Sequence, residues 1–148
     1  MELIELPDEI YEQIEALSEA GNECSDEEDH EGAIGNWQQA LSLLPEPHQD
    51  WEAATWLYAS LGDAYCQSGQ YELSKDASFN ALNCPDGQDN PFIYYTLGKA
   101  LLRLDDEQAV DALLRAYMLD GTDIFDTDGE EGEECLQVLA DRGLLEEH

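Results

Sequence analysis

The side chains that could act as nucleophiles or metal ligands are scattered along this sequence. The three histidines stand far apart, at His30, His48 and His148. The four cysteines form no CxxC pair and are Cys24, Cys66, Cys84 and Cys135. No Ser/His/Asp set, phosphate-binding loop or HExxH motif accompanies them. We therefore expect no catalytic residues, no cofactor and no metal centre, and we expect the thiols to be reduced and mostly buried.

One segment concentrates possible cation ligands: the acidic stretch TDIFDTDGEEGEE that follows Gly121. If Gly129 were the glycine of an EF-hand calcium loop, Asp would be needed at position 124 and Glu at position 135. The sequence has Ile124 and Cys135 there, so the calcium template fails. We expect a solvated acidic loop, and the alternative is weak, nonspecific binding of divalent cations.

Acidic residues dominate the charge of the chain. Asp and Glu total 36, and the formal net charge is −31. The basic side chains are Lys75, Lys99, Arg103, Arg115 and Arg142. Such a charge repels phosphate groups and anionic lipids, which argues against direct binding to nucleic acid or membranes, and it attracts cationic proteins. The alternative is that the charge only keeps the chain soluble.

The hydrophobic pattern bears on the location of the protein. The sequence has no run of about 18 apolar residues that could span a membrane. Its beginning, MELIELPDEI, lacks the basic and apolar regions of a signal peptide. We therefore expect a cytoplasmic protein.

Three segments of the chain share one spacing of large and small residues. The first contains Leu17, Ala20, Gly21 and Cys24, then Ala33, Trp37, Ala40 and Pro45. The second contains Tyr58, Leu61, Gly62 and Tyr65, then Ala81 and Pro85. The third contains Tyr94, Leu97, Gly98 and Leu101, then Ala109, Leu113, Ala116 and Gly121. Large residues can fill the space between two antiparallel helices, small residues let the helices approach closely, and proline ends the second helix.

This pattern resembles the tetratricopeptide repeat (TPR), a helical hairpin of about 34 residues. The resemblance implies an all-α solenoid in a single domain over 1–148. Its repeats would cover about 8–47, 50–86 and 89–121, with an acidic loop and a capping helix at 122–148. The sequence departs from the family pattern in the second and third repeats. Ser74 and Ser78 replace Ala and a large residue, Phe79 sits one place late, and the turn near Asp105 is one residue short.

Local signals support these helices. Pro7 precedes acidic residues that suit the first turn of a helix. The amphipathic stretch from Trp51 to Ser68 is followed by Gly69, a typical helix end. Asn90 followed by Pro91 is typical of an N-cap and a first helical position. The stretch ECLQVLADRGLL predicts a terminal helix that covers the last repeat, as solenoids require.

In the TPR family the first helix of each pair lines a concave groove, and the register transfers this role to particular positions here. The residues that we expect to bind a partner are Glu15, Asn22, Asp26, Trp56, Asp63, Phe92, Tyr95, Lys99 and Arg103. The same register includes Ser18, Ala59, Cys66, Gln67 and Leu102. Aromatic residues are common interface anchors. The alternatives are that Trp56 and Phe92 only pack between repeats, and that Lys99 and Arg103 only neutralise Asp63.

The resemblance implies a protein-binding scaffold that is not an enzyme. The runs DWEAATWLYASLGDAY and ALNCPDGQDNPF are similar to small TPR immunity proteins encoded beside bacterial polymorphic toxins. Toxins that attack nucleic acid are often basic, and an acidic inhibitor would be steered to them quickly. We therefore expect a cationic protein partner, with a toxin domain as the candidate. The alternative is a secretion or assembly chaperone that holds a partner segment in the groove, and a helical enzyme is a more distant alternative.

Overall fold

The computed structural model describes residues 7–45, 51–85 and 87–144, and this part of the chain is 80% helical without a strand. Three helix pairs follow one another: α1 (Asp8–Asp26) with α2 (His30–Ser42), α3 (Glu52–Gln67) with α4 (Tyr71–Leu82), and α5 (Pro91–Arg103) with α6 (Gln108–Asp120). A short 3-10 helix, η2 (Gly87–Asp89), precedes α5, and α7 (Asp123–Asp126) and α8 (Gly129–Asp141) follow α6. The predicted fold class, a TPR-type solenoid of helical hairpins, is confirmed.

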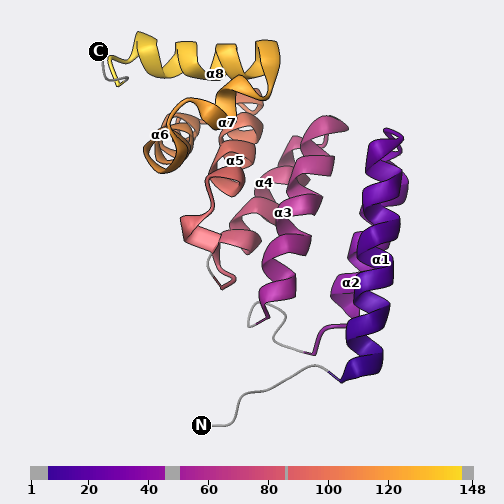
Figure 1. The fold of residues 1–148 in the computed structure, drawn as a ribbon. Helices are drawn as coiled ribbons and strands as arrows, with labels where there is room; N and C mark the ends of the chain where they lie inside the picture. Colours follow the sequence, from indigo (N-terminus) through magenta and orange to yellow (C-terminus); the bar gives the residue numbers. More distant parts are fainter. Residues whose placement is uncertain (1–6, 46–50, 86, 145–148) are drawn as a thin grey trace, which may run out of the picture.

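The helix pairs stack side by side in chain order (Figure 1). The second helix of one pair packs on the first helix of the next, α2 on α3 and α4 on α5, and α3 also contacts α5. One hydrophobic core joins α1 to α4, and a second joins α5 to α8. The first helices, α1 and α3, lie in front of α2 and α4 in Figure 1, so successive first helices share one face of the solenoid.

The same turn ends the first helix of each pair. One residue in each turn has a left-handed backbone: Glu28 (φ 63°), Gly69 (φ 82°) and Asp105 (φ 56°). The next backbone N–H reaches back to a carbonyl of the helix, as in the bond from Asp29 to Cys24 O at 2.7 Å, which is the Schellman arrangement. Gly69 therefore ends α3 as predicted, whereas Glu28 and Asp105 adopt this conformation without glycine's steric freedom.

A glycine of each first helix faces the second helix at close range. A Cβ added at Gly98 would lie 2.5 Å from Leu113 Cδ2, and one added at Gly21 would overlap the Trp37 ring. In the middle pair the residue opposite Gly62 is Ser78, whose Oγ would lie 2.8 Å from such a Cβ. The helices therefore touch where the glycines are, and only the middle pair lacks a large residue at that contact.

Replacing Gly98 by Leu is expected to lower the free energy of unfolding by about 1–3 kcal/mol, because the new side chain must displace Leu113 from a packed core. The control is Gly35→Leu on α2, where an added Cβ meets no atom within 4 Å. A helix former at that position should leave stability unchanged or raise it by up to about 1 kcal/mol. Urea unfolding of the two variants measures the contrast. Equal midpoints for Gly98→Leu and the parent protein would contradict the helix register.

The end of the solenoid differs from the sequence prediction. The segment expected to be a solvated acidic loop contains α7, and α8 begins within it at Gly129 rather than near Glu134. Phe125 explains the difference, because its fully buried side chain fixes α7 against the core of the last pair. Gly129 has a positive φ of 60° that lets the chain turn, and Glu130 and Glu131 favour a helix N-terminus.

Polar contacts join this cap to α5. Asp128 Oδ2 accepts a hydrogen bond from the Tyr95 hydroxyl at 2.5 Å and pairs with Lys99 Nζ at 3.1 Å. Lys99 Nζ also lies 4.6 Å from the centre of the Tyr95 ring, and the Tyr95 and Phe125 rings meet edge to face at 5.1 Å. Glu131 Oε1 also lies 4.0 Å from Lys99 Nζ, so two carboxylates face this buried cation, and the contacts attach the cap to α5.

Burial and the contacts with Asp128 together leave three pKa values around the cap above their usual values. Burial and the hydrogen bond to Asp128 raise the pKa of Tyr95. Burial raises the pKa of Cys135 to about 12. Burial alone would lower the pKa of Lys99, but the hydrogen bond to Asp128 and the charge of that carboxylate raise it above the usual value. All three groups therefore hold their protons more tightly in the folded chain than in the unfolded one.

Stability is expected to fall as the pH rises above about 9. The reference pKa values are 9.0 for Cys135, 10.0 for Tyr95 and 10.5 for Lys99. Because the folded values are raised, the unfolded chain releases these protons first, so the stabilisation is complete below the reference values and is lost as the pH passes the folded ones. Urea midpoints between about pH 8 and 11 test this, and Tyr95→Phe should reduce the loss above about pH 10. A midpoint constant across this range would contradict the described cap.

Candidate protein-binding surface

Two large aromatic side chains remain exposed on the face formed by the first helices. Trp56 on α3 is 43% exposed and Phe92 at the start of α5 is 38% exposed. Both line one hollow of about 350 Å³, together with Thr55, Ala59, Ser60, Pro85 and Asn90. The hollow offers apolar surface to a partner at the junction of the second and third helix pairs.

Local contacts hold this hollow in shape. The Thr55 hydroxyl donates to the Pro85 carbonyl at 2.8 Å, which fixes the chain between the two pairs against α3. Asn90 caps α5 as predicted, since its side chain accepts from the Phe92 N–H at 3.0 Å. The Trp56 ring packs edge-on against Trp37, with centroids 6.0 Å apart at 85°. Trp56 therefore does pack between repeats, yet much of its surface stays open to solvent.

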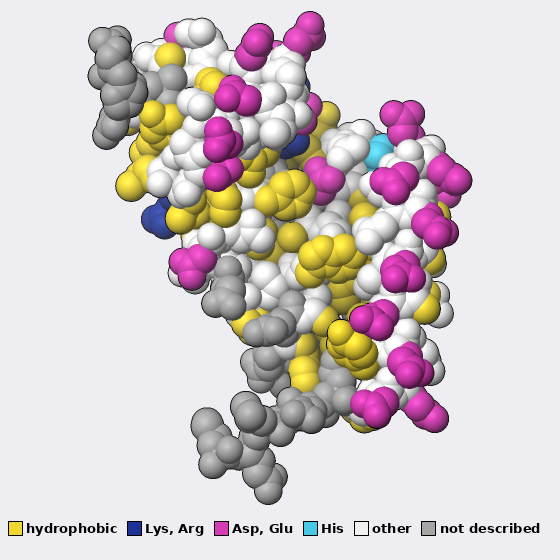
Figure 2. All heavy atoms as spheres, in the orientation of Figure 1, with side chains coloured by type: hydrophobic (Ala, Val, Ile, Leu, Met, Phe, Trp, Pro, Cys, Tyr) yellow, Lys and Arg dark blue, Asp and Glu magenta, His cyan; other side chains and the backbone are white. Residues whose placement is uncertain are grey.

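The neighbouring helix α1 has acidic side chains without local compensation. The first Lys or Arg of the sequence is Lys75, so no such residue occurs on α1 or α2. Among the predicted positions on α1, Glu15, Asn22 and Asp26 are all exposed. Figure 2 shows hydrophobic side chains gathered along the middle of this face, with Asp and Glu in a column along α1 and more of them at the α7–α8 end. We call the surface formed by α1, Trp56 and Phe92 the acidic-aromatic face.

The remaining predicted residues lie elsewhere than the sequence suggested. Tyr95 is only 3% exposed and Lys99 is buried, and both are engaged by Asp128 of the cap. Arg103 pairs with Glu134 of α8 at 3.4 Å. Lys99 and Arg103 therefore pair with the cap instead of neutralising Asp63, whose carboxylate accepts from Gln67 at 2.7 Å. Because Asp128 and Glu134 engage Tyr95, Lys99 and Arg103, the acidic-aromatic face extends only to the start of α5.

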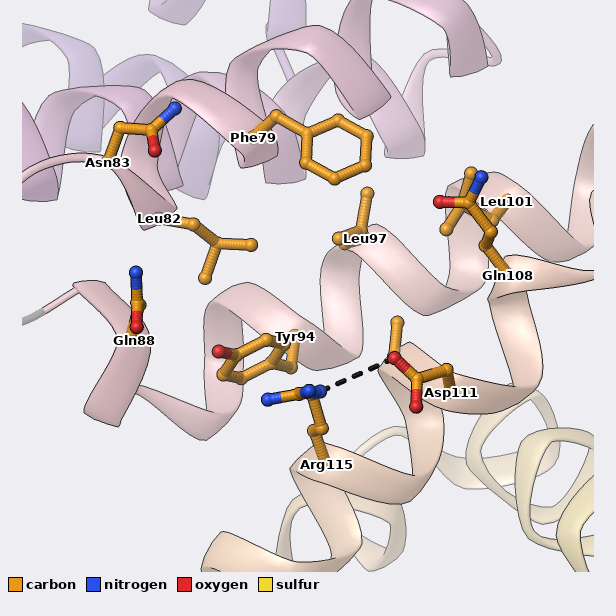
Figure 3. Close-up of a pocket in the computed structure, with 11 residues that line it drawn as sticks. Phe79, Leu82, Asn83, Gln88, Tyr94, Leu97, Leu101, Gln108, Asp111 and Arg115 are labelled. Atoms are coloured by element: carbon orange, nitrogen blue, oxygen red, sulfur yellow. Dashed lines mark hydrogen bonds and ion pairs between the residues drawn. The ribbon is translucent and has the colours of Figure 1, made fainter.

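Sequence reasoning missed a second surface between α4 and α6. Two adjoining hollows there share Gln88, Tyr94, Asp111 and Arg115, and we call them together the α4–α6 groove. Figure 3 shows Phe79 and Leu82 of α4 facing Tyr94 and Leu97 of α5, with Arg115 and Asp111 of α6 on the other side. Arg115 Nε lies 3.3 Å from Asp111 Oδ2, and its guanidinium carbon lies 5.8 Å from the centre of the Tyr94 ring. The late position of Phe79 in the repeat was the sequence signal for this groove.

The described residues contain neither a cluster of metal ligands nor a helix that could span a membrane. Across 7–45, 51–85 and 87–144, no three His, Cys, Asp or Glu side chains come together as a group that could hold a metal ion. None of the helices in the same ranges is both long and apolar enough to cross a membrane. The cysteines in those ranges are free thiols, three of them buried and Cys24 half-buried.

Comparison with known proteins shows similarity of fold. No protein-family model matches the sequence. No curated protein matches it either. Among solved structures, the chain is similar to the crystal structure of MamA protein, a protein that contains TPRs, with a TM-score of 0.63 and 22% identity over 85% of this chain and 70% of the other. At this identity the similarity shows the TPR-type fold that the helix pairs already indicate.

Proposed function

We propose that this chain is a protein-binding scaffold whose acidic-aromatic face binds a cationic segment of a partner protein. The observation that supports the proposal is that the exposed Trp56 and Phe92 share one face of the solenoid with α1, a helix that has many carboxylates and no Lys or Arg (Figures 1 and 2). An exposed apolar hollow marks a contact site, and the surrounding charge selects the sign of its partner.

The aromatic side chains and the carboxylates of this face affect different steps of binding. Aromatic side chains that become desolvated in the complex slow its dissociation. The exposed carboxylates of α1 act at a distance of about a Debye length, roughly 8 Å at physiological salt, so they mainly speed the encounter. The described ion pairs all lie between Glu72 and Glu134, which leaves the field of α1 uncompensated within the described residues.

The probe for both effects is a pair of synthetic peptides that share length and apolar residues and differ only in having Lys and Arg or Glu and Gln at their polar positions. We expect the cationic peptide to bind and the anionic peptide not to bind. Trp56→Ala with Phe92→Ala should cost about 2 kcal/mol or more, roughly a 30-fold loss of affinity through faster dissociation. The control is Phe79→Ala, an exposed aromatic residue on α4 that lies in the α4–α6 groove, away from the hollow. Unchanged dissociation from the folded double variant would contradict the anchoring role of the hollow.

The charge effect has its own pair of variants. Glu15→Gln with Asp26→Asn should slow association of the cationic peptide several-fold and weaken its dependence on salt, with dissociation little changed. The control, Glu107→Gln with Asp120→Asn, removes the same charge at the two ends of α6. Stopped-flow association at low and physiological salt measures both pairs. Equal slowing by the two pairs would mean that only the total charge acts, and not α1.

A more specific form of the proposal identifies the partner as a toxin domain that this chain neutralises. It is supported by the sequence resemblance to TPR immunity proteins and by the charge of −31, which suits a basic toxin. Co-expression with a growth-inhibiting basic toxin domain, chosen from the genes next to its own, tests it. The unchanged chain should restore growth, and the Trp56→Ala, Phe92→Ala variant should not. Growth inhibition that persists with both would contradict the neutralising role while leaving peptide binding intact.

A further inference from the structure

The α4–α6 groove is a hollow with both apolar and polar lining residues, and it lies beside an apolar ridge. Phe79 and Leu82 of α4 form one wall, and Tyr94 and Leu97 of α5 form the floor. On the α6 side, Met118 and Leu119 stand beside the groove, and the Met118 side chain is 74% exposed. A long apolar side chain that exposed, next to an open hollow, is typical of a surface that is covered in the working protein.

The groove originates in the departure of the middle repeat from the shared pattern. In the first and third pairs, Trp37 and Leu113 fill the contact opposite the glycine of the first helix. In the middle pair Ser78 occupies that place and is buried, with Ser74 Oγ donating to the Gly62 carbonyl at 2.7 Å. The large residue, Phe79, is therefore displaced by one position, 39% exposed, and lines the groove instead of the core.

We propose that the α4–α6 groove is a contact between two copies of this chain, related by a two-fold axis. Such a contact requires one surface to complement itself, with a ridge and a hollow side by side. Met118 and the hollow at Phe79 meet this requirement. Asp111 and Arg115 lie in the middle of the same surface as an acid and a base one helical turn apart, so each can face its opposite on the second copy.

The distribution of charge permits this contact despite the net charge of −31. The helices α4 and α6 contain two bases, Lys75 and Arg115, and four acids, so they are less acidic than α1, which has seven acids and no base. The acidic column of α1 belongs to the first pair, and its field is screened over roughly 8 Å at physiological salt. The dimer would leave the acidic-aromatic face open, so each dimer would present two such faces to partners.

The size of the surface predicts a weak dimer. The helices α4 and α6 have 12 and 13 residues and are each about 18–20 Å long. A contact along their outer surfaces is therefore at or below the standard interface size. We therefore expect a dissociation constant in the micromolar range, and weaker association at low salt, where repulsion between the copies is less screened.

Sedimentation equilibrium of the full chain between about 1 µM and 1 mM tests the proposal. A reversible monomer–dimer equilibrium is expected, and Met118→Glu should raise the dissociation constant at least tenfold. Tyr11→Glu is the control, since it adds the same charge to an exposed apolar position on α1. If the chain is a monomer at all concentrations, the proposal is overturned and the groove is left to a different partner. A dimer that Met118→Glu does not weaken also overturns the proposal.

Charge exchange then tests the two-fold arrangement. Asp111→Arg gives a copy with two bases in the groove, and Arg115→Asp gives a copy with two acids. Each alone should associate more weakly than the parent chain, and an equimolar mixture of the two should form a heterodimer. The heterodimer forms only if residue 111 of one copy faces residue 115 of the other. A local effect of either substitution on α6 would weaken association in the mixture as well, so it cannot produce the heterodimer. A mixture that associates no better than its components overturns the proposed pairing. Peptide binding to the acidic-aromatic face should be unchanged in the Met118, Asp111 and Arg115 variants, so this proposal can fail without the proposed function failing.

Discussion

The close contact between the two helices of each pair is the constraint on which the rest of the structure depends. At Gly21, Gly62 and Gly98 the first helix approaches the second so closely that a Cβ would need the facing side chain to move. This contact fixes the rotation of each helix about its axis, and therefore which side chains face the core and which face solvent. With that rotation set, Trp56 and Phe92 reach the shared face of the first helices. The middle pair meets the same constraint with Ser78, which leaves Phe79 on the opposite surface.

The basic residues all lie in the second half of the sequence, so the two ends of the solenoid differ in how their acids are paired. In the C-terminal half, three bases pair with acids nearby: Lys99 with Asp128, Arg103 with Glu134 and Arg115 with Asp111. Burial alone would lower the pKa of Lys99, because desolvation disfavours an isolated ammonium group, and the pairing with Asp128 more than offsets this. The N-terminal pair has no base to pair with, and its acids stay exposed. The first pair therefore has exposed carboxylates and no base, whereas the C-terminal end is also acidic but has several carboxylates paired with bases.

The sequence predicted the features that depend on local residues. The glycine spacing identified the helix pairs, Gly69 marked the end of α3, and Asn90 with Pro91 marked the start of α5. These signals act within one turn of helix. The roles of Tyr95 and Lys99 were not predictable in this way, because their partner Asp128 lies 33 and 29 residues further along the chain. The buried Phe125 likewise gives helical structure to a segment whose composition indicates a solvated loop. The displaced Phe79 was visible in the sequence, but the groove that it lines depends on the spacing of α4 and α6, which no local pattern contains.

The central claim is that a cationic segment binds the acidic-aromatic face, and NMR mapping of the bound cationic peptide tests it most directly. The indole N–H signals of the tryptophans give separate reporters, since Trp56 is exposed whereas Trp37 is buried with its Nε1 3.4 Å from the Ser18 carbonyl. The account predicts that titration shifts the Trp56 indole signal and the amides of α1 and the start of α5 most strongly. The largest shifts on α4 and α6, with the Trp56 indole unchanged, would contradict it.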